Sequence, residues 1–247
     1  MKTQNTFFIK FTVYFLIISV LTALFCVFVC GSMKNGTSDV FEDDPKTADK
    51  MLTVVIDAGH GGEDGGASSA AGLYEKDVNL DISMMLYDMF TANGVNVVMT
   101  RTDDRLLYNR NIDFKGRKKM LDLAARLSIA EKTPDSIFLS IHMNAFTDPR
   151  YDGLQVWYSP NNEESEKIAK LIQDGAKILQ PENNRKIKKA GSNIYLLHRS
   201  DSPSVLVECG FLSNPAEAKK LENREYRRQI AFVIFNSVME YLTPGES

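Results

Sequence analysis

Short apolar segments alternate with longer amphipathic segments over most of this chain. The short segments are rich in β-branched residues, which is typical of buried strands, whereas the longer ones repeat apolar side chains every three or four residues, which is typical of helices. The predicted strands are 51–57, 95–101, 136–142, 153–159, 193–197 and 204–208, and the predicted helices are 78–90, 120–127, 163–179, 216–223 and 226–241. This alternation predicts a single layered α/β domain, residues 51–243, with a mostly parallel twisted sheet covered by helices on both faces.

A different kind of segment precedes the predicted domain. The 21 residues from Phe11 to Gly31 carry no charge, which is about the length that a helix needs to cross a bilayer. Two lysines precede this segment and acidic residues follow it, so we expect residues 1–10 to be cytoplasmic and the remainder to be exported. A cleavable signal peptide is the alternative, although the apolar run exceeds the usual ~7–15 residues and has no A-x-A site. The polar residues 32–50 are predicted to be a linker.

Charge and cysteine content exclude several classes of protein. The formal net charge is −3, which lacks the basic excess that binding to a nucleic acid backbone requires. Of the three cysteines, Cys26 and Cys30 lie in the apolar segment, and only Cys209 lies in the predicted domain. Neither a disulfide framework nor a cysteine-based zinc finger can be built from this set.

Histidine and glutamate side chains follow or end several of the predicted strands. His60 lies in a glycine-rich loop after the first strand, His142 ends the third, and Glu208 ends another, while Glu75 begins a helix. The carboxyl ends of parallel strands meet at one edge of a sheet. Two imidazoles and one carboxylate form a common ligand set of catalytic zinc, with a further carboxylate needed to carry protons. We therefore predict one Zn²⁺ held by His60, Glu75 and His142, with Glu208 as the base.

The residue pattern alone leaves alternatives open. His60 and Glu63 form an H-x-x-E pair, a spacing used by zinc carboxypeptidases, which would put Glu63 on the ion in place of Glu75. Each histidine could instead be a structural, hydrogen-bonded residue, Glu75 a first-turn helix acid, and Glu208 an ion-pair partner. Nucleotide binding is disfavoured, because the third glycine of a G-x-G-x-x-G pattern is replaced by Asp64.

Five motifs in this order carry a resemblance to a known family: IDAGHGGEDGGA, LYEKDVNL, TRTDD, LSIHMNA and LVECGFLSNPAE. The chain resembles the zinc-dependent N-acetylmuramoyl-L-alanine amidases of the amidase-3 family from Leu52 to Leu242. The resemblance implies a phosphorylase/hydrolase-like α/β fold, His60, Glu75 and His142 as zinc ligands, and Glu208 as catalytic acid and base. It therefore selects Glu75 over Glu63. Two departures lie beside the site: Ala58 stands where the family has proline, and Cys209 where it has a smaller or apolar residue.

Within this family, the N-terminal apolar segment, the lack of wall-binding repeats and the inserted residues 105–126 are similar to the sporulation and germination-specific cortex amidases of endospore formers. The similarity implies cleavage between N-acetylmuramic acid and L-alanine in the spore cortex, on the way to muramic-δ-lactam. The expected location is the extracytoplasmic face of the membrane, including the intermembrane space of the developing spore. The expected partners are peptidoglycan, the membrane through residues 11–31, and an exported accessory protein.

Several polar residues are weaker candidates for substrate contact. The basic residues of the inserted segment could face an anionic glycan or peptide, namely Arg117, Lys118, Lys119 and Arg126. Asn144 and His198 are candidates for orienting a ligand or the substrate. Two other functions remain as alternatives: a zinc carboxypeptidase that trims stem peptides, and a peptidoglycan-binding module without turnover, which the intact Glu208 disfavours.

Overall fold

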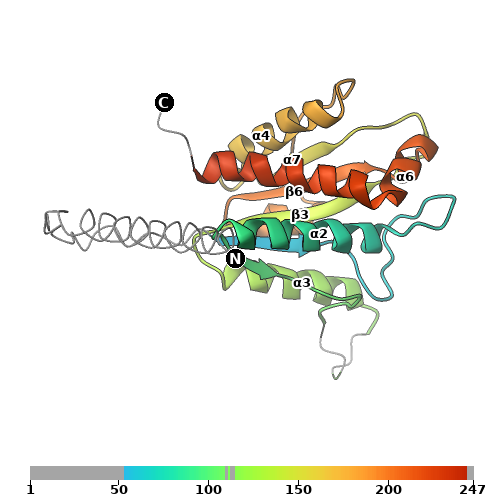
Figure 1. The fold of residues 1–247 in the computed structure, drawn as a ribbon. Helices are drawn as coiled ribbons and strands as arrows, with labels where there is room; N and C mark the ends of the chain where they lie inside the picture. The colour runs from blue at the N-terminus through green and yellow to red at the C-terminus, as the bar shows by residue number, and fades with distance from the viewer. Residues whose placement is uncertain (1–52, 109–110, 112–114, 244–247) are drawn as a thin grey trace, which may run out of the picture. The chain divides into compact units, whose positions relative to one another are not determined.

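The computed structural model describes residues 53–108, 111 and 115–243 (Figure 1). The predicted membrane segment 11–31 and the predicted linker 32–50 lie outside these residues. Across the described part of the chain, no helix is both long and apolar enough to span a bilayer.

Six strands and six helices are described. In chain order they are β1 Thr53–Ala58, α2 Glu75–Ala92, β2 Asn96–Met99, α3 Lys118–Glu131, β3 Ser136–Asn144, β4 Gln155–Tyr158, α4 Glu164–Leu179, β5 Lys188–Lys189, α5 Tyr195–Arg199, β6 Ser204–Phe211, α6 Pro215–Glu222 and α7 Arg224–Leu242. They form the single α/β domain that the sequence predicts.

The strands form one sheet in the order β2-β1-β3-β6-β4-β5. The four strands β2, β1, β3 and β6 are parallel, as predicted, but β4 pairs antiparallel with β6, so the sheet is mixed. The reversal follows from the connection between β3 and β4, residues 145–154, which contains no helix. Without a crossover, the chain re-enters the sheet from the end at which it left.

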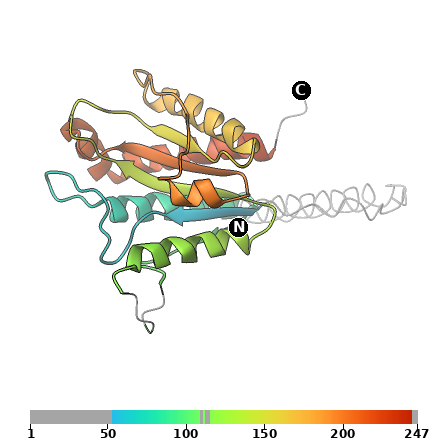
Figure 2. The ribbon, with the colours of Figure 1, turned by 180° about the vertical axis from the view of Figure 1, so that it is seen from behind.

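Helices cover both faces of the sheet (Figures 1 and 2). Alternate residues of a strand point to opposite faces, and β1 shows this directly. Val54 and Ile56 pack into the core with α2, α4 and α7, whereas Val55 packs with α3 and α5 on the other face. Removing this apolar surface from water stabilises the sheet between its two helical layers.

The predicted strand at 193–197 is wrong. Residues 195–199 form the short helix α5, and the edge strand in this region is instead β5. Leu196 and Leu197 are both buried in the cluster that includes Leu206 of β6. Consecutive residues of a strand would point to opposite faces, so a helical turn is the conformation that buries both leucines on one side.

Candidate metal centre and active site

The candidate site lies at the carboxyl ends of the parallel strands. His60 follows β1 after one glycine, Glu75 is the first residue of α2, and His142 and Glu208 lie near the ends of β3 and β6. In the pairing of these two strands, His142 is directly opposite Glu208. The topology therefore gathers four residues that are separated by up to 148 positions in the chain.

The carboxylate of Glu75 lies between the two imidazoles. Its Oε1 atom is 3.2 Å from His60 Nε2 and 2.9 Å from His142 Nδ1. The imidazole rings are 5.0 Å apart between centroids and nearly perpendicular. In the described residues, these three side chains form a group able to hold a metal ion, with one ligand atom from each lying within 4.8 Å of the others.

Glycines allow the loop after β1 to approach these side chains. A Cβ atom on Gly59 would overlap the imidazole of His142. A Cβ on Gly66 would lie 2.5 Å from Glu75 Oε2 and 2.8 Å from His60 Cδ2, and the φ of this residue is +65°. His60 also has a positive φ, +62°, which is uncommon for a residue with a side chain. The position of the His60 imidazole thus depends on an unfavourable backbone conformation, which persists only because contacts with the surrounding residues hold the loop.

Backbone and side-chain donors hold Glu75 in place. The amide of Ala67 donates to Oε2 at 2.8 Å, and the amide of Met143 donates to Oε1 at 3.0 Å. Asn79, one turn along α2, donates at 3.4 Å to Oε1 and at 3.1 Å to the carbonyl of Gly59. Such supporting hydrogen bonds orient ligands before a metal arrives.

Charge interactions favour the ionised carboxylate. Burial alone would raise the pKa of Glu75, but hydrogen bonds and positive charge from His142 and His60 lower it far below its ordinary value. Burial alone would lower the pKa of His142, yet its hydrogen bond to Glu75 and the nearby carboxylates raise it. A negative charge at the centre of the group is therefore stabilised by these histidines, and a metal cation bound between the three side chains would stabilise it in the same way.

Glu208 is held in a different environment. Burial raises its pKa to about 7, and the negative charge of Glu75 adds to this effect, while His142 and His60 oppose it. Within the described part of the chain, its Oε2 atom is buried without a hydrogen-bond partner. A carboxyl group with a pKa near neutrality and an uncommitted oxygen can accept and return a proton.

Arg126, which the sequence offers as a candidate for substrate contact, is buried beneath the site. It donates 2.7 Å hydrogen bonds to Asp57 and to the carbonyl of Ala58, and a 2.6 Å bond to the carbonyl of His60. Its Nε donates to Asp122 at 2.8 Å. Burial would raise the pKa of Asp57, but Arg126 and Ser140 lower it below its ordinary value. The position of Arg126 therefore suits support of the His60 loop, and its donors are directed into the protein.

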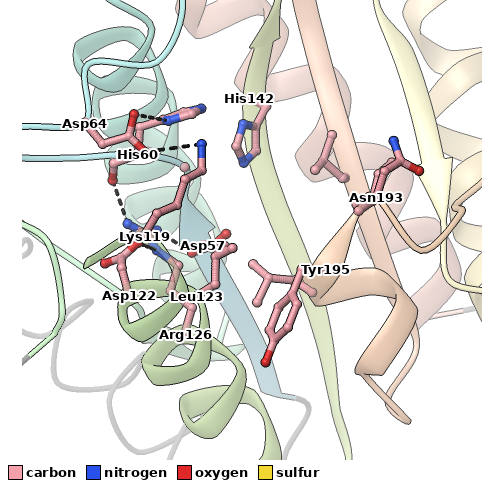
Figure 3. A pocket seen from close by; sticks show the side chains of 14 residues that line it. Asp57, His60, Asp64, Lys119, Asp122, Leu123, Arg126, His142, Asn193 and Tyr195 are labelled. Carbon is pink, nitrogen blue, oxygen red and sulfur yellow. Dashed lines mark hydrogen bonds and ion pairs between the residues drawn. The ribbon is translucent and has the colours of Figure 1, made fainter. Parts of the chain in front are cut away.

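A pocket of about 210 Å³ opens beside the two histidines (Figure 3). His60, Asp64 and Lys119 line one side, Asn193 and Tyr195 line the other, and the apolar floor includes Leu123, Ile194, Leu196 and Leu206. The Nζ of Lys119 is 3.8 Å from Asp64 Oδ2. Asp64 Oδ1 is in turn 3.0 Å from His60 Nδ1, a contact at ion-pair distance without the angles of a directed hydrogen bond.

The other predicted residues do not belong to the group of three that could hold a metal ion. Glu63, the alternative ligand, is exposed, and its carboxylate binds Lys118 Nζ at 2.8 Å. His198 is exposed on α5, its carbonyl accepts a bond from Asn161, and it does not line the pocket. Asn144 ends β3 opposite Phe211, two residues beyond His142. Arg117 is exposed at the start of α3.

The sequence interpretation missed four supporting residues: Asp57, Asp64, Asn79 and Arg101. Arg101 is 1% exposed and donates to the carbonyls of Ala58, Gly59, Lys76 and Asp103 at 2.8–3.0 Å. A signal for Asn79 was available, since it lies four residues after Glu75 on a predicted helix and shares its face. Asp57 and Arg101 had no comparable signal, because burial of a charge is invisible in a sequence pattern.

The chemistry of the three candidate ligands fits a zinc ion. Two imidazole nitrogens and one carboxylate oxygen are borderline ligands of the type that zinc accepts, and three protein ligands leave a position for water or substrate. Glu208, whose Oε2 atom is buried without a hydrogen-bond partner among the described residues, is paired on the neighbouring strand with His142, one of the three residues that would hold the ion.

Comparison with known proteins gives a consistent result. The family model Amidase_3, described as N-acetylmuramoyl-L-alanine amidase, matches residues 54–240. The chain is 35% identical over 190 residues to the germination-specific N-acetylmuramoyl-L-alanine amidase of Bacillus subtilis, covering 77% of this chain and 79% of that protein.

Solved structures of similar proteins share the fold. The CwlD amidase from Clostridioides difficile, solved in complex with the GerS lipoprotein, matches with a TM-score of 0.74 and 37% identity, over 78% of this chain and all of that chain. The amidase AmiC2 of Nostoc punctiforme matches with a TM-score of 0.64 and 34% identity, over 78% of this chain and 98% of that one.

Proposed function

Since this chain belongs to the Amidase_3 family of N-acetylmuramoyl-L-alanine amidases, we propose that it cleaves the bond between the lactyl group of N-acetylmuramic acid and L-alanine, using one zinc ion. The chain is thus a peptidoglycan amidase. Its catalytic mechanism, its use of zinc and its place of action are proposed below. One observation carries it: the side chains of His60, Glu75 and His142 converge on one point, with Glu208 paired to His142 on the next strand.

His60, Glu75 and His142 would hold the zinc, which supplies a Lewis acid that polarises the scissile carbonyl and makes water more acidic. Glu208 accepts a proton from the attacking water on its uncommitted carboxylate oxygen. The same carboxyl then delivers the proton to the nitrogen of L-alanine as the amide bond breaks. In the metal-free chain, burial raises the pKa of Glu208 to about 7, so this carboxyl group holds a proton far more readily than an exposed glutamate does.

The rest of the site keeps these groups in position. Arg126 and Arg101 bind the carbonyls of residues 58–60 from below, so the His60 loop has fixed anchor points. Leu123, Ile194 and Leu206 give the neighbouring pocket an apolar wall, which reduces competition from bulk water. Lys119 at the pocket mouth offers a cation to an anionic part of the substrate.

The spore cortex is the proposed place of action. Similarity to the germination-specific amidase of Bacillus subtilis and to the CwlD amidase supports it. Hydrolysis leaves the lactyl carboxylate of muramic acid free, which is the group that must be available for closure of muramic-δ-lactam. We further propose an extracytoplasmic location, attachment to the membrane through residues 11–31, and an exported lipoprotein partner, by analogy with the complex of that relative.

Hydrolysis in ¹⁸O-labelled water tests the proposed bond directly. Water adds its hydroxyl to the lactyl carbonyl carbon and its hydrogen to the amine. Mass spectrometry should therefore find one ¹⁸O atom in the muramic acid product and none in the released stem peptide. A carboxypeptidase would instead put ¹⁸O into the peptide and release a terminal amino acid, and a binding module would release nothing.

A further inference from the structure

Exposed aromatic side chains concentrate at the metal-site end of the sheet. Within the described residues, four aromatic side chains are strongly exposed: Tyr74 at 51%, Phe146 at 54%, Tyr151 at 45% and Phe232 at 53%. The first three lie on the loops 59–74 and 145–154, which extend from the same end of the sheet (Figures 1 and 2), and Phe232 lies on α7. Clustered exposed aromatics mark interaction surfaces more often than isolated ones do.

Phe146 and Tyr151 are in contact with each other and form what we call the aromatic platform. Their rings pack edge to face with centroids 4.8 Å apart. Tyr151 is also stacked on Phe211, with centroids 6.3 Å apart and planes inclined by 25°. Phe211 is 3% exposed at the end of β6, so the platform has a buried ring as its foundation.

Interactions with neighbouring segments fix the platform. The amide of Phe146 donates to Ser213 Oγ at 2.9 Å, and Asn214 Nδ2 donates to the carbonyl of Tyr151 at 3.3 Å. The guanidinium of Arg185 lies 4.4 Å from the centre of the Phe211 ring and 5.5 Å from that of Tyr151. A surface held in this way loses little conformational entropy when a ligand binds.

The platform continues from the candidate active site along two strands. Phe211 lies three residues after Glu208 on β6, and Phe146 lies four residues after His142. Asn144, two residues after His142, pairs with Phe211, so at about 3.3 Å per residue Phe211 is roughly 7 Å along the sheet from the His142–Glu208 pair. A peptidoglycan strand whose lactyl–alanine bond lies beside His142 and Glu208 would therefore reach this surface with the groups next to that bond.

We propose that the aromatic platform binds a sugar ring of the glycan strand to which the scissile lactyl group is attached. The inference rests on the proposed function. The face of a pyranose ring carries C–H groups that pack on an aromatic ring, while its hydroxyl groups stay in water. The stem peptide begins at the cleaved bond with alanine, whose methyl group offers no comparable flat apolar face, so the glycan is the better occupant.

Binding of glycan strands from which the peptides have been removed tests the platform without any need for turnover. The full-length chain is compared with Phe146→Ala/Tyr151→Ala, with Phe146→Trp/Tyr151→Trp, and with Phe232→Ala as the matched exposed aromatic on another surface. We expect the double alanine variant to bind roughly tenfold more weakly, and the double tryptophan variant and Phe232→Ala to bind as the unchanged chain does. On intact peptidoglycan, the alanine variant should raise KM and change kcat little.

The outcomes separate the platform from the proposed function. Unchanged glycan binding by a double alanine variant with an unchanged unfolding temperature would overturn the platform. Unchanged glycan binding with loss of binding to an exported protein would also overturn it, and would identify the surface as a protein interface. If the unchanged chain hydrolyses no peptidoglycan but its glycan binding still depends on the two rings, the proposed function fails and the platform stands.

Discussion

His142 lies directly opposite Glu208 in the parallel pairing of β3 with β6. The proposed metal ligand and the proposed proton carrier are therefore separated by one row of strand-to-strand hydrogen bonds, with no loop between them. Central strands are among the least mobile parts of a domain, so this arrangement keeps the distance between the two side chains constant. The loop after β1, in contrast, must bring His60 to the same place by its own contacts.

Glu208→Gln should remove proton transfer and keep the metal. The amide has nearly the same shape as the carboxylate but cannot accept a proton at neutral pH, so kcat should fall by about 10²–10⁴-fold. Zinc content, measured on the same preparations, should equal that of the unchanged chain. Full activity in the variant would exclude Glu208 as the base.

Gly66→Ala should displace two metal ligands, and Gly72→Ala supplies the matched control. Both glycines have positive φ, +65° and +85°, so each alanine brings a similar backbone strain, of order 1–2 kcal/mol. Only the new Cβ at position 66 would meet Glu75 and His60, whereas position 72 has open space. We expect competition with a chromogenic chelator to show weaker zinc binding in Gly66→Ala alone. Equal affinities in the two variants would contradict the described loop.

Arg126→Met should destabilise the fold strongly. The change leaves Asp57 and Asp122 buried without their cation, which typically costs about 3–5 kcal/mol. Arg150→Met is the control, because Arg150 pairs with Asp148 at 2.7 Å on the surface, with its side chain 88% exposed. Urea denaturation should show a large loss of stability for the first variant and little change for the second, because solvent screens an exposed ion pair. Similar losses would refute a buried charge network.

The stability of the metal-free chain should depend on pH through Glu208. Its pKa in the fold, about 7, is higher than its ordinary value of 4.5, so between these values the folded state binds more protons than the unfolded state does. The resulting stabilisation is present below about pH 4.5 and is lost as the pH rises through about 7. Denaturation of chelator-treated protein should show the free energy of unfolding falling, relative to Glu208→Gln, from pH 5 to pH 8. A constant difference would be inconsistent with a buried, neutral Glu208.

The sequence predicted the layered α/β class because the apolar periodicity is long and regular in most elements. It did not predict the antiparallel β4, since the pattern of a buried strand contains no direction. It also assigned 193–197 to a strand, because a run of four apolar and aromatic residues fits either conformation until the neighbours that bury Leu196 and Leu197 are known.

The sequence predicts that His60, Glu75, His142 and Glu208 meet at one edge of the sheet, and in the structure these four residues lie at the carboxyl ends of the parallel strands. Spacing alone left Glu63 as a rival ligand, and only the path of the loop directs Glu63 towards Lys118. Arg126 was assigned with the basic residues of the inserted segment, although it is buried while its neighbours Arg117 and Lys119 are exposed. The sequence does not show which of the basic residues on this helix is buried. That becomes clear only when the buried partner of Arg126, Asp57, is known.

The central claim is that this metal site and Glu208 together cleave the bond to L-alanine. The most direct test is mass spectrometry of peptidoglycan incubated with the full-length chain loaded with zinc, with the chain stripped by a chelator, and with zinc-loaded Glu208→Gln. We predict stem peptides that begin with free L-alanine in the first reaction alone, and their return when zinc is added back to the stripped chain. Release of these peptides by the stripped chain or by Glu208→Gln at an undiminished rate would contradict the account.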